Sequence, residues 1–226
     1  MSTLIIAPLQ IELDALVAGF AEHGHLPTPG QIGRLPVLQL PSLALTLACG
    51  GHGKTQFGVQ TQHLLDHAPA VEAVICAGAA GALDPAIGLA DLVLAAETVE
   101  HDYTQRFRPH PLPRFPGDPG LLAALGALAG ELSAFRVFAG IVASGDEDVI
   151  ELERAAALRQ ATEACAVAWE GAGGARACRF SGARYLELRA ITDTADHQAP
   201  VHFAANLQRA MANVATLLTH WRSRQA

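Results

Sequence analysis

Three carboxylates, Glu12, Glu170 and Asp193, occur where the chain could carry out acid–base chemistry. Glu170 directly precedes a Gly- and Ala-rich run, which predicts a helix packed closely against its neighbours. The mostly apolar stretch 185–191 predicts a strand, and Asp193 follows its C-terminal end, where ligands bind in open α/β sheets. Taken singly, each acid also fits a solvated or helix-capping role. Three acids converging on one edge of a sheet favour proton transfer to and from a ligand.

Strands and helices alternate along the chain and would position these acids. Apolar runs predict strands over 3–7, 35–40, 43–48, 71–77, 91–96, 137–143 and 185–191. Amphipathic stretches predict helices over 11–20, 121–132, 151–162 and 201–222, and one more that ends at 67. Residues 24–34 and 106–120, rich in Gly or Pro, predict loops. Without a repeat or linker, this order predicts a single α/β domain over residues 1–226 around a central mixed sheet.

Composition argues against several classes of partner. The net charge is −7 and Lys54 is the only lysine, so no basic patch is visible to neutralise nucleic-acid phosphates. No apolar run reaches the roughly 20 residues of a membrane span, and the N-terminus lacks the basic segment of a signal peptide. The four cysteines form no C-x-x-C pair, which favours buried reduced thiols in a cytoplasmic protein.

Other motifs give weaker signals. Residues 50–54 resemble a phosphate-binding loop only superficially, because its spacing is absent, and a tight turn into a helix explains them better. The segment Gly78-Ala-Ala-Gly81 follows a buried strand, so its backbone N–H groups could approach a ligand. The ten histidines are scattered without metal-ligand spacing, and no G-x-S-x-G motif occurs. We therefore expect no metal site.

The order of several short motifs resembles the purine nucleoside phosphorylase superfamily over nearly the whole chain. Within it, the chain is similar to the 5′-methylthioadenosine/S-adenosylhomocysteine nucleosidases. The motifs are Ile-Ile-x-x-Leu-x-x-Glu12, Gly51-x-Gly53-Lys54, Gly78-x-Ala80-Gly81, His101-Asp102, Ala143-Ser-Gly-Asp146, Trp-Glu170-Gly and Arg189-Ala-Ile-Thr-Asp193. The resemblance implies a three-layer α/β/α fold around a mixed, partly barrel-like sheet. It also implies a homodimer in which the partner subunit closes each active site.

The resemblance implies a reaction as well: hydrolysis of the N-glycosidic bond of a 5′-modified adenosine, with release of adenine through an oxocarbenium-like sugar. No cofactor or metal takes part. Asp193 matches the family residue that protonates purine N7, and a raised pKa would suit that role. Glu12 matches the residue that orients and deprotonates the attacking water. Glu170 matches the residue that binds the ribose hydroxyls, where its charge also favours the cationic sugar.

The resemblance extends to the substrate pocket. Leu9, His52 and Phe203 match positions around the 5′ substituent, and the partner's segment from His101 to Phe107 is expected to complete that pocket. The remaining positions matched to substrate contacts are Ala79, Gly81, Asp148, Val149 and Trp169.

Several of these residues depart from the family pattern. Ala79 replaces a serine near the water, Asp148 replaces an aromatic residue that stacks on the purine, and Trp169 replaces a methionine beside the ribose. Ala168 stands where a second acid is frequent. His52 is more polar than the usual aliphatic residue, which predicts a 5′ substituent other than plain methylthio.

Three alternatives remain open on the sequence. Phosphorylases of the superfamily place arginines in the turn after the first strand and before the glycine-rich turn, but here Pro8-Leu9-Gln10-Ile11 and Ile75-Cys76-Ala77 contain none, which favours water as the nucleophile. A nucleosidase or phosphorylase for another 5′ group, of the futalosine or adenosyl-hopane type, would share the same acids. A non-catalytic nucleoside-binding protein would bind substrate without releasing base.

Overall fold

One mixed sheet runs through the molecule, and the computed structural model describes it over residues 2–225. Its strands are β1 (Ser2–Ala7), β2 (Thr28–Ile32), β3 (Leu35–Leu40), β4 (Leu45–Cys49), β5 (Val71–Ala82), β6 (Leu92–Glu100), β7 (Arg114–Pro116), β8 (Val137–Ser144), β9 (Ala166–Ala168) and β10 (Arg184–Asp193). The helices are α1 (Gln10–Glu22), α2 (Gly53–His67), α3 (Pro119–Gly126), α4 (Leu152–Thr162), α5 (Gly171–Ser181) and α6 (Ala199–Ser223), with a 3-10 turn η1 (Pro41–Leu43).

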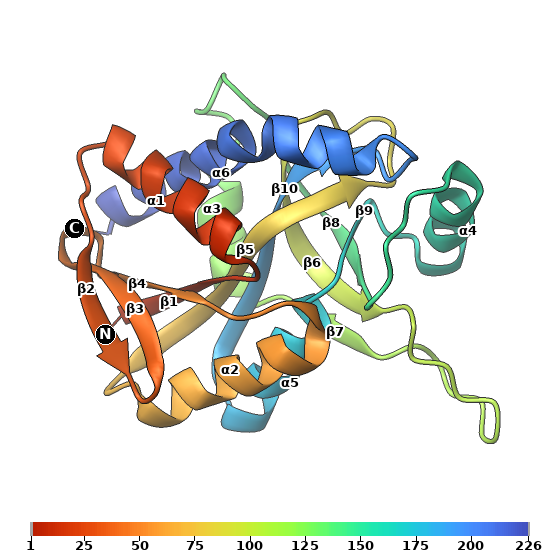
Figure 1. Ribbon diagram of the computed structural model, residues 1–226, viewed down its shortest axis with the longest axis horizontal. Helices are drawn as coiled ribbons and strands as arrows, with labels where there is room; N and C mark the ends of the chain where they lie inside the picture. Colours follow the sequence, from red (N-terminus) through yellow and green to blue (C-terminus); the bar gives the residue numbers. More distant parts are fainter. Residues whose placement is uncertain (1, 226) are drawn as a thin grey trace.

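Part of the sheet closes on itself. The strand order is β10-β6-β8-β9-β5-β1-β4-β3-β2, and β10 also pairs with β5. The strands β10, β6, β8, β9 and β5 therefore form a ring, from which β1, β4, β3 and β2 extend as an open wing (Figure 1). Parallel pairs such as β1–β5 and β5–β10 occur beside antiparallel pairs such as β6–β10. The expected mixed, partly barrel-like α/β fold is confirmed.

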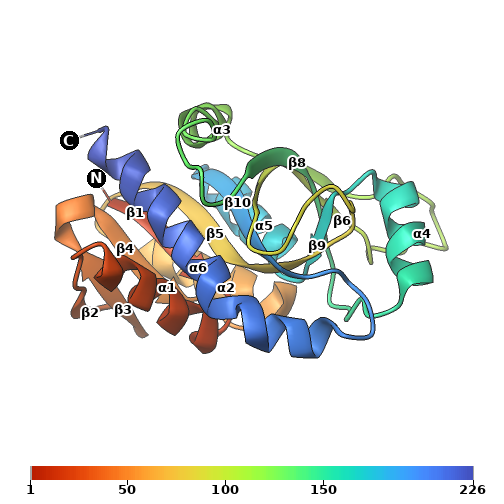
Figure 2. The same ribbon diagram turned by 90° about the horizontal axis from the view of Figure 1, so that it is seen from above.

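Helices cover both faces of the sheet. The helices α1 and α6 pack on each other along one face, and α2 packs on α5 along the other (Figures 1 and 2). The first contact is close, because a Cβ added at Gly19 of α1 would lie 2.9 Å from the Cα of Ala212 in α6. The second is closer still, because a Cβ at Gly173 would lie 2.2 Å from the carbonyl oxygen of Lys54. The small residues after Glu170 thus allow the close helix packing that the sequence predicts.

Several predicted boundaries are wrong. The loop expected over 24–34 contains β2, which tolerates Pro29 because it lies at the end of the sheet order. Within the loop expected over 106–120 lies β7, and α3 ends at Gly126 rather than at 132. The strand expected to stop at 77 continues as β5 through the glycine-rich segment to Ala82, since β9 and β10 supply it with hydrogen-bonding partners there. Asp193 is the last residue of β10 and does not follow the strand.

Candidate active site

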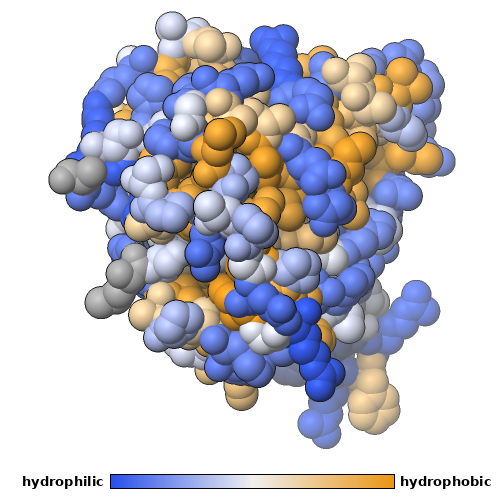
Figure 3. All heavy atoms as spheres, turned by 60° about the vertical axis from the view of Figure 1, so that its left-hand side comes forward, coloured by the Kyte–Doolittle hydropathy of each residue, from blue (hydrophilic) through white to orange (hydrophobic). Residues whose placement is uncertain are grey.

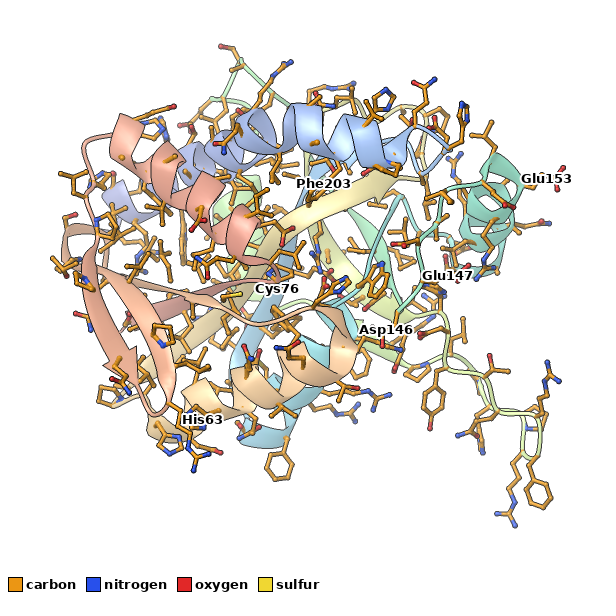
Figure 4. All side chains as sticks on the ribbon, in the orientation of Figure 1. His63, Cys76, Asp146, Glu147, Glu153 and Phe203 are labelled. Atoms are coloured by element: carbon orange, nitrogen blue, oxygen red, sulfur yellow. The ribbon has the colours of Figure 1, made fainter. Side chains whose placement is uncertain are left out.

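A cavity of about 450 Å³ opens where several strands end. The ends of β9 and β10 and the segments that follow β1, β4 and β8 line it, together with part of β5, Glu12 of α1 and the start of α6. Figure 4 labels two of its residues, Glu147 after β8 and Phe203 on α6. The lining residues are Pro8, Leu9, Glu12, His52, Ala79, Ala80, Gly81, Glu147, Asp148, Val149, Ile150, Val167, Ala168, Trp169, Glu170, Thr192, Asp193, Ala199, Pro200 and Phe203. The three acids singled out in the sequence therefore share one cavity.

Glu12 lies in the first turn of α1 and is held by two backbone donors. Its Oε2 accepts a hydrogen bond from the N–H of Leu9 and its Oε1 accepts one from the N–H of Ala79, each over 2.7 Å. Gly78 makes this approach possible, because a Cβ there would lie 2.9 Å from Oε1. The side chain is buried, and burial raises the pKa of Glu12 from 4.5 to about 7. A carboxylate of that pKa can take up a proton near neutral pH.

Asp193 ends β10 at the opposite end of the sequence. Its Oδ2 accepts a hydrogen bond from the hydroxyl of Thr192 over 2.9 Å, and its Oδ1 accepts one from the N–H of Ala195 over 3.0 Å. Ala195 adopts a left-handed backbone conformation (φ 51°), which turns its N–H back toward the strand end. A Cβ at Gly81 would lie 2.8 Å from Oδ1, so glycine makes room for the carboxylate. Burial raises the pKa of Asp193, which favours a protonated carboxyl.

Glu170 precedes α5 and is bound from two sides. The N–H of Gly53, at the start of α2, donates to its Oε1 over 3.2 Å. The guanidinium of Arg189 donates from Nη2 to its Oε2 over 3.4 Å. Arg189 also donates to Glu187 over 2.7 Å and to the carbonyl of Ala79 over 3.2 Å. The buried guanidinium thus connects β10 with the ligand-facing segments around Glu170 and Ala79.

Sequence reasoning did not single out Arg189 as a site residue, although it lies within a quoted motif. Its side chain is 1% exposed, and it belongs to the core strand β10 between Leu188 and Ala190. The sequence held a signal: Glu187 lies two residues earlier, and residues i and i+2 of a strand point to the same face. A charge pair inside an otherwise apolar strand indicates a buried polar network. Further cavity residues that the sequence analysis did not select are Pro8, Ala80, Glu147, Ile150, Val167, Ala168, Thr192, Ala199 and Pro200.

An aromatic pair forms another wall of the cavity. The imidazole of His52 stacks on the indole of Trp169, with ring centroids 4.2 Å apart and planes 21° apart. His52 is exposed and Trp169 half-buried. The remaining residues selected from the sequence for this cavity also line it: Leu9, Ala79, Gly81, Asp148, Val149 and Phe203.

His101 and Phe107 do not line the cavity of their own chain. His101 is buried against Gly145, and within residues 2–225 neither of its ring nitrogens has a hydrogen-bond partner. Burial lowers the pKa of His101, which keeps the imidazole neutral. Phe107 is 95% exposed, on the loop that extends away from the molecule after β6 (Figure 1). Their expected contribution to a partner's pocket stays a prediction.

Comparison with known proteins shows the family to which the chain belongs. The family model described as "Phosphorylase superfamily" matches residues 3–221. The chain belongs to the phosphorylase superfamily. This superfamily member is 30% identical over 229 residues to a 5′-methylthioadenosine/S-adenosylhomocysteine nucleosidase of Geobacillus thermodenitrificans, covering 96% of this chain and 94% of the relative. It is also 33% identical over 154 residues to an aminodeoxyfutalosine nucleosidase of Helicobacter pylori, covering 66% and 67% of the two chains.

Solved structures agree with the observed fold of this superfamily member. A Helicobacter pylori nucleosidase mutant with 5′-methylthioadenosine in its active site is similar with a TM-score of 0.87, at 24% identity, over 99% of this chain and 98% of that one. The Neisseria meningitidis 5′-methylthioadenosine/S-adenosylhomocysteine nucleosidase, in complex with methylthio-immucillin-A, is similar with a TM-score of 0.84, at 25% identity, over 100% and 99%. The ring-and-wing sheet is thus the fold of nucleosidases in this superfamily.

Proposed function

We propose that the protein is a purine nucleosidase that hydrolyses the N-glycosidic bond of a 5′-modified adenosine and releases adenine. The observation that carries the proposal is the convergence of Glu12, Glu170 and Asp193 on one cavity, in a chain related to nucleosidases over most of its length. The geometry supplies a base, an anchor for the sugar and an acid in one cavity. These are the three groups that dissociative cleavage of a nucleoside requires.

In this mechanism Asp193 protonates the departing purine. An anionic purine is a poor leaving group, so a proton delivered at the base lowers the barrier. Burial raises the pKa of Asp193, which favours the protonated form that this role needs, and its hydrogen bonds to Thr192 and Ala195 fix the direction of the carboxyl. The proton passes to the ring nitrogen as the bond to the sugar breaks, and the bonding electrons leave with the base.

Glu12 deprotonates the attacking water. The hydrogen bonds from Leu9 and Ala79 hold its two oxygens in place, and its pKa of about 7 suits a general base at neutral pH. The water oxygen bonds to the sugar carbon and its proton moves to the Glu12 carboxylate. The N–H of Ala79 donates to Glu12, and the carbonyl of Ala79 accepts a hydrogen bond from Arg189. The buried guanidinium therefore fixes the backbone segment that orients the base.

Glu170 binds the sugar hydroxyls. Its carboxylate is anchored by the N–H of Gly53 and by Arg189, which leaves its remaining lone pairs for the ribose. A negative charge at this position also stabilises the positive charge that grows on the sugar in the transition state.

The charges around the cavity favour water over phosphate. Five carboxylates line it, Glu12, Glu147, Asp148, Glu170 and Asp193, and no lysine or arginine of the described chain lines it with them. A phosphate anion entering among these acids would meet like charges, which cost free energy at close range. The lining therefore supports the hydrolase over the phosphorylase.

A second candidate substrate is a nucleoside with a larger 5′ group, of the futalosine type. The relative named aminodeoxyfutalosine nucleosidase is 33% identical. The stacked His52 and Trp169, with Phe203, give the cavity an aromatic wall suited to a planar or bulky substituent. Both candidates use the same three acids, so the 5′ group alone separates them.

We further infer that residues 1–226 act as one catalytic domain, as a homodimer in the cytoplasm. The exposed Phe107, Val59 and Phe180 offer apolar surface for a second copy, and Figure 3 shows apolar patches among hydrophilic residues on one face of the molecule. The loop that carries Phe107 is the segment expected to reach a partner's cavity. The four cysteines are free, which fits a reducing compartment. Within residues 2–225, the helices are too short or too polar to cross a membrane.

Release of purine base, followed by chromatography, tests the proposed function. The panel contains 5′-methylthioadenosine, S-adenosylhomocysteine, 5′-deoxyadenosine, aminodeoxyfutalosine, adenosine and inosine, each with and without phosphate. We expect adenine release that does not depend on phosphate and that is faster for 5′-modified adenosines than for adenosine. Release that requires phosphate would replace the hydrolase by a phosphorylase, and binding without release from any substrate would establish a binding protein.

A further inference from the structure

The only lysine of the chain, Lys54, lies at the centre of a charged network beside the cavity. Its Nζ donates to Glu100 over 3.0 Å and also to Asp102. Arg176, on α5, donates from Nε to the second oxygen of Glu100 over 3.2 Å. The Lys54 side chain is 15% exposed and that of Glu100 8%, so both charges are largely removed from water. None of these four residues lines the cavity.

The network reaches the cavity through the segment that follows β8. The second carboxylate oxygen of Asp102 accepts the backbone N–H of Asp146 over 2.9 Å. The carboxylate of Asp146, in turn, accepts the backbone N–H of Lys54 over 2.8 Å. Lys54 thus holds Asp146 in two ways. Its backbone N–H binds the Asp146 carboxylate directly, and its side chain binds Asp102, which accepts the Asp146 N–H. Asp146 immediately precedes the wall segment 147–150, and Figure 4 places it beside the N-terminal end of α2.

The same turn of α2 touches the other walls of the cavity. His52, just before the helix, stacks on Trp169, and the N–H of Gly53 donates to Glu170. Three consecutive residues therefore contact three walls: the aromatic pair, the acid assigned to the ribose, and the segment after β8. Of these three residues, Lys54 is the one whose charged side chain joins the network with Glu100 and Asp102.

The positive charge of Lys54 balances the two carboxylates that it binds, Glu100 and Asp102. Burial lowers the pKa of Lys54, but the hydrogen bonds to Asp102 and Glu100 outweigh it and raise the pKa above its ordinary value. Burial likewise raises the pKa of Asp102, but hydrogen bonds from Lys54 and the Asp146 N–H outweigh it and hold that pKa below its ordinary value. Without the ammonium group, Glu100 and Asp102 would face each other as carboxylates, with only Arg176 beside Glu100. Asp102 would then turn toward solvent and release Asp146.

We propose that Lys54 is a positioning residue, which fixes the segment 147–150 against the substrate by holding Asp102 and Asp146. The inference rests on the proposed nucleosidase function, because the substrate is the ligand that the positioned wall contacts. Lys54 itself touches no substrate, so its loss should change binding more than chemistry. That expectation separates positioning from a general effect on folding.

Steady-state kinetics on 5′-methylthioadenosine test the proposal with Lys54→Met, which keeps the length of the side chain without its charge. We expect KM to rise roughly tenfold, the effect of losing one hydrogen bond to a charged group, while kcat changes less than about threefold. The double variant Lys54→Met/Asp102→Asn should return KM to within about threefold of the wild type. The asparagine oxygen can still accept the Asp146 N–H, and no unpaired charge remains.

Arg136→Met is the matched control. Arg136 donates to Asp91 over 2.6 Å in an ion pair whose arginine side chain is 60% exposed, and neither residue lines the cavity. We expect this variant to lower Tm while leaving KM unchanged. The proposal is overturned if Lys54→Met leaves KM unchanged well below its own Tm, if the double variant is no better than the single one, or if Arg136→Met raises KM equally.

Selective labelling gives a second readout that does not need turnover. Protein labelled with 15N-lysine shows one backbone amide signal, the Lys54 N–H that donates to Asp146. In labelled Asp102→Ala protein, which cannot accept the Asp146 N–H, we expect a displaced signal, and we expect 5′-methylthioadenosine to move the wild-type signal more than that of this variant. A signal unchanged by Asp102→Ala would overturn the coupling. If the wild type releases no adenine from any substrate, the proposed function fails, and this signal still decides whether Asp102 acts on the α2 junction.

Discussion

Glu12 and Asp193 are both buried acids with raised pKa values, yet the two ends of the chain hold them differently. Two backbone N–H groups point at Glu12, one at each oxygen. Asp193 receives one backbone N–H and one hydroxyl, that of Thr192. An N–H can only donate, whereas a hydroxyl can also accept. Protonation of Glu12 therefore places its new O–H beside a donor, while protonated Asp193 has a neighbour able to accept. The surroundings favour Glu12 as the base and Asp193 as the acid.

Replacing the acid gives the largest expected effect. Asp193→Asn keeps the shape of the side chain but cannot deliver the proton, so kcat should fall by roughly 10²- to 10⁴-fold. Rates of adenine release measure this loss. The exposed Asp14→Asn, on α1, is the matched control and should retain wild-type activity. Unchanged turnover in Asp193→Asn would remove Asp193 from the chemistry and favour a different donor.

Replacing the base tests the other half of the comparison. Glu12→Gln should also lower kcat by roughly 10²-fold or more, because the amide cannot accept the proton of water. In addition, the side-chain NH₂ group of this glutamine must face one of the two backbone N–H groups that donate to the carboxylate in the wild type. Binding of 5′-methylthioadenosine, measured by calorimetry, should persist. A variant with normal kcat would show that the water needs no base at this position.

The pH dependence of the free energy of unfolding tests whether burial raises the pKa of Glu12. A rise from 4.5 to about 7 corresponds to about 3 kcal/mol, since each tenfold change in an ionisation constant is worth about 1.4 kcal/mol. Because the folded-state pKa is raised, this stability is fully present below pH 4.5 and is lost as the pH rises through 7. Wild type should therefore gain up to about 3 kcal/mol over Glu12→Gln between pH 8 and pH 5, measured by urea unfolding. If the free energies of unfolding of the wild type and Glu12→Gln differ by the same amount at both pH values, the pKa of Glu12 is not raised by folding.

The pH dependence of the rate should report the ionisation of Glu12, because only the carboxylate can act as the base. Glu12 must be ionised to accept a proton, so kcat/KM of the wild type should decline as the pH falls below about 7. At pH 6 the rate should be about a tenth of its plateau, following one ionisation. The role proposed for Asp193 predicts an opposing decline of kcat/KM at higher pH, where its carboxyl loses the proton. A rate that stays constant from pH 8 to pH 6 would show that Glu12 does not limit the reaction.

The aromatic wall should give the smallest effect. His52→Ile removes one ring of the stacked pair, and we expect it to shift the preference among 5′ substituents by about tenfold or less, as a change in one pocket contact does. The ratio of kcat/KM for aminodeoxyfutalosine to that for 5′-methylthioadenosine measures it. If 5′-methylthioadenosine is the best substrate and His52→Ile costs nothing, the polar residue has no part in selecting the 5′ group.

The sequence predicted the apolar strands well because their burial on both faces leaves a continuous apolar run, as in β1. It missed β9, which has three residues and depends on strands β5 and β8 on either side. It ended β5 too early, because Gly and Ala at 78–82 are typical of a turn when their pairing partners are unknown. Pairing between distant segments is a tertiary property that local patterns do not encode.

The site was predictable where motifs fix a residue at the end of a strand, which is why three separated acids proved to share a cavity. Arg189 was not singled out, because two of its three partners, Ala79 and Glu170, are brought to it only by the fold. The stack of His52 on Trp169 was likewise not foreseen, since the two residues come from different strand ends. Sequence order located the acids, whereas the groups that orient them are visible only in space.

The ring of strands has a consequence for how the protein is made. Arg189 on β10 meets Ala79 on β5 across 110 residues of chain, and α6 must still follow. Contacts between segments so far apart form slowly, because a long loop has to close first. A nascent chain carries Glu12 long before Arg189 and Asp193, so the acids of the cavity come together only after β10 has been made. Loss of the chain from Arg184 onward would remove Asp193 and Phe203 from the cavity and the guanidinium that holds Ala79.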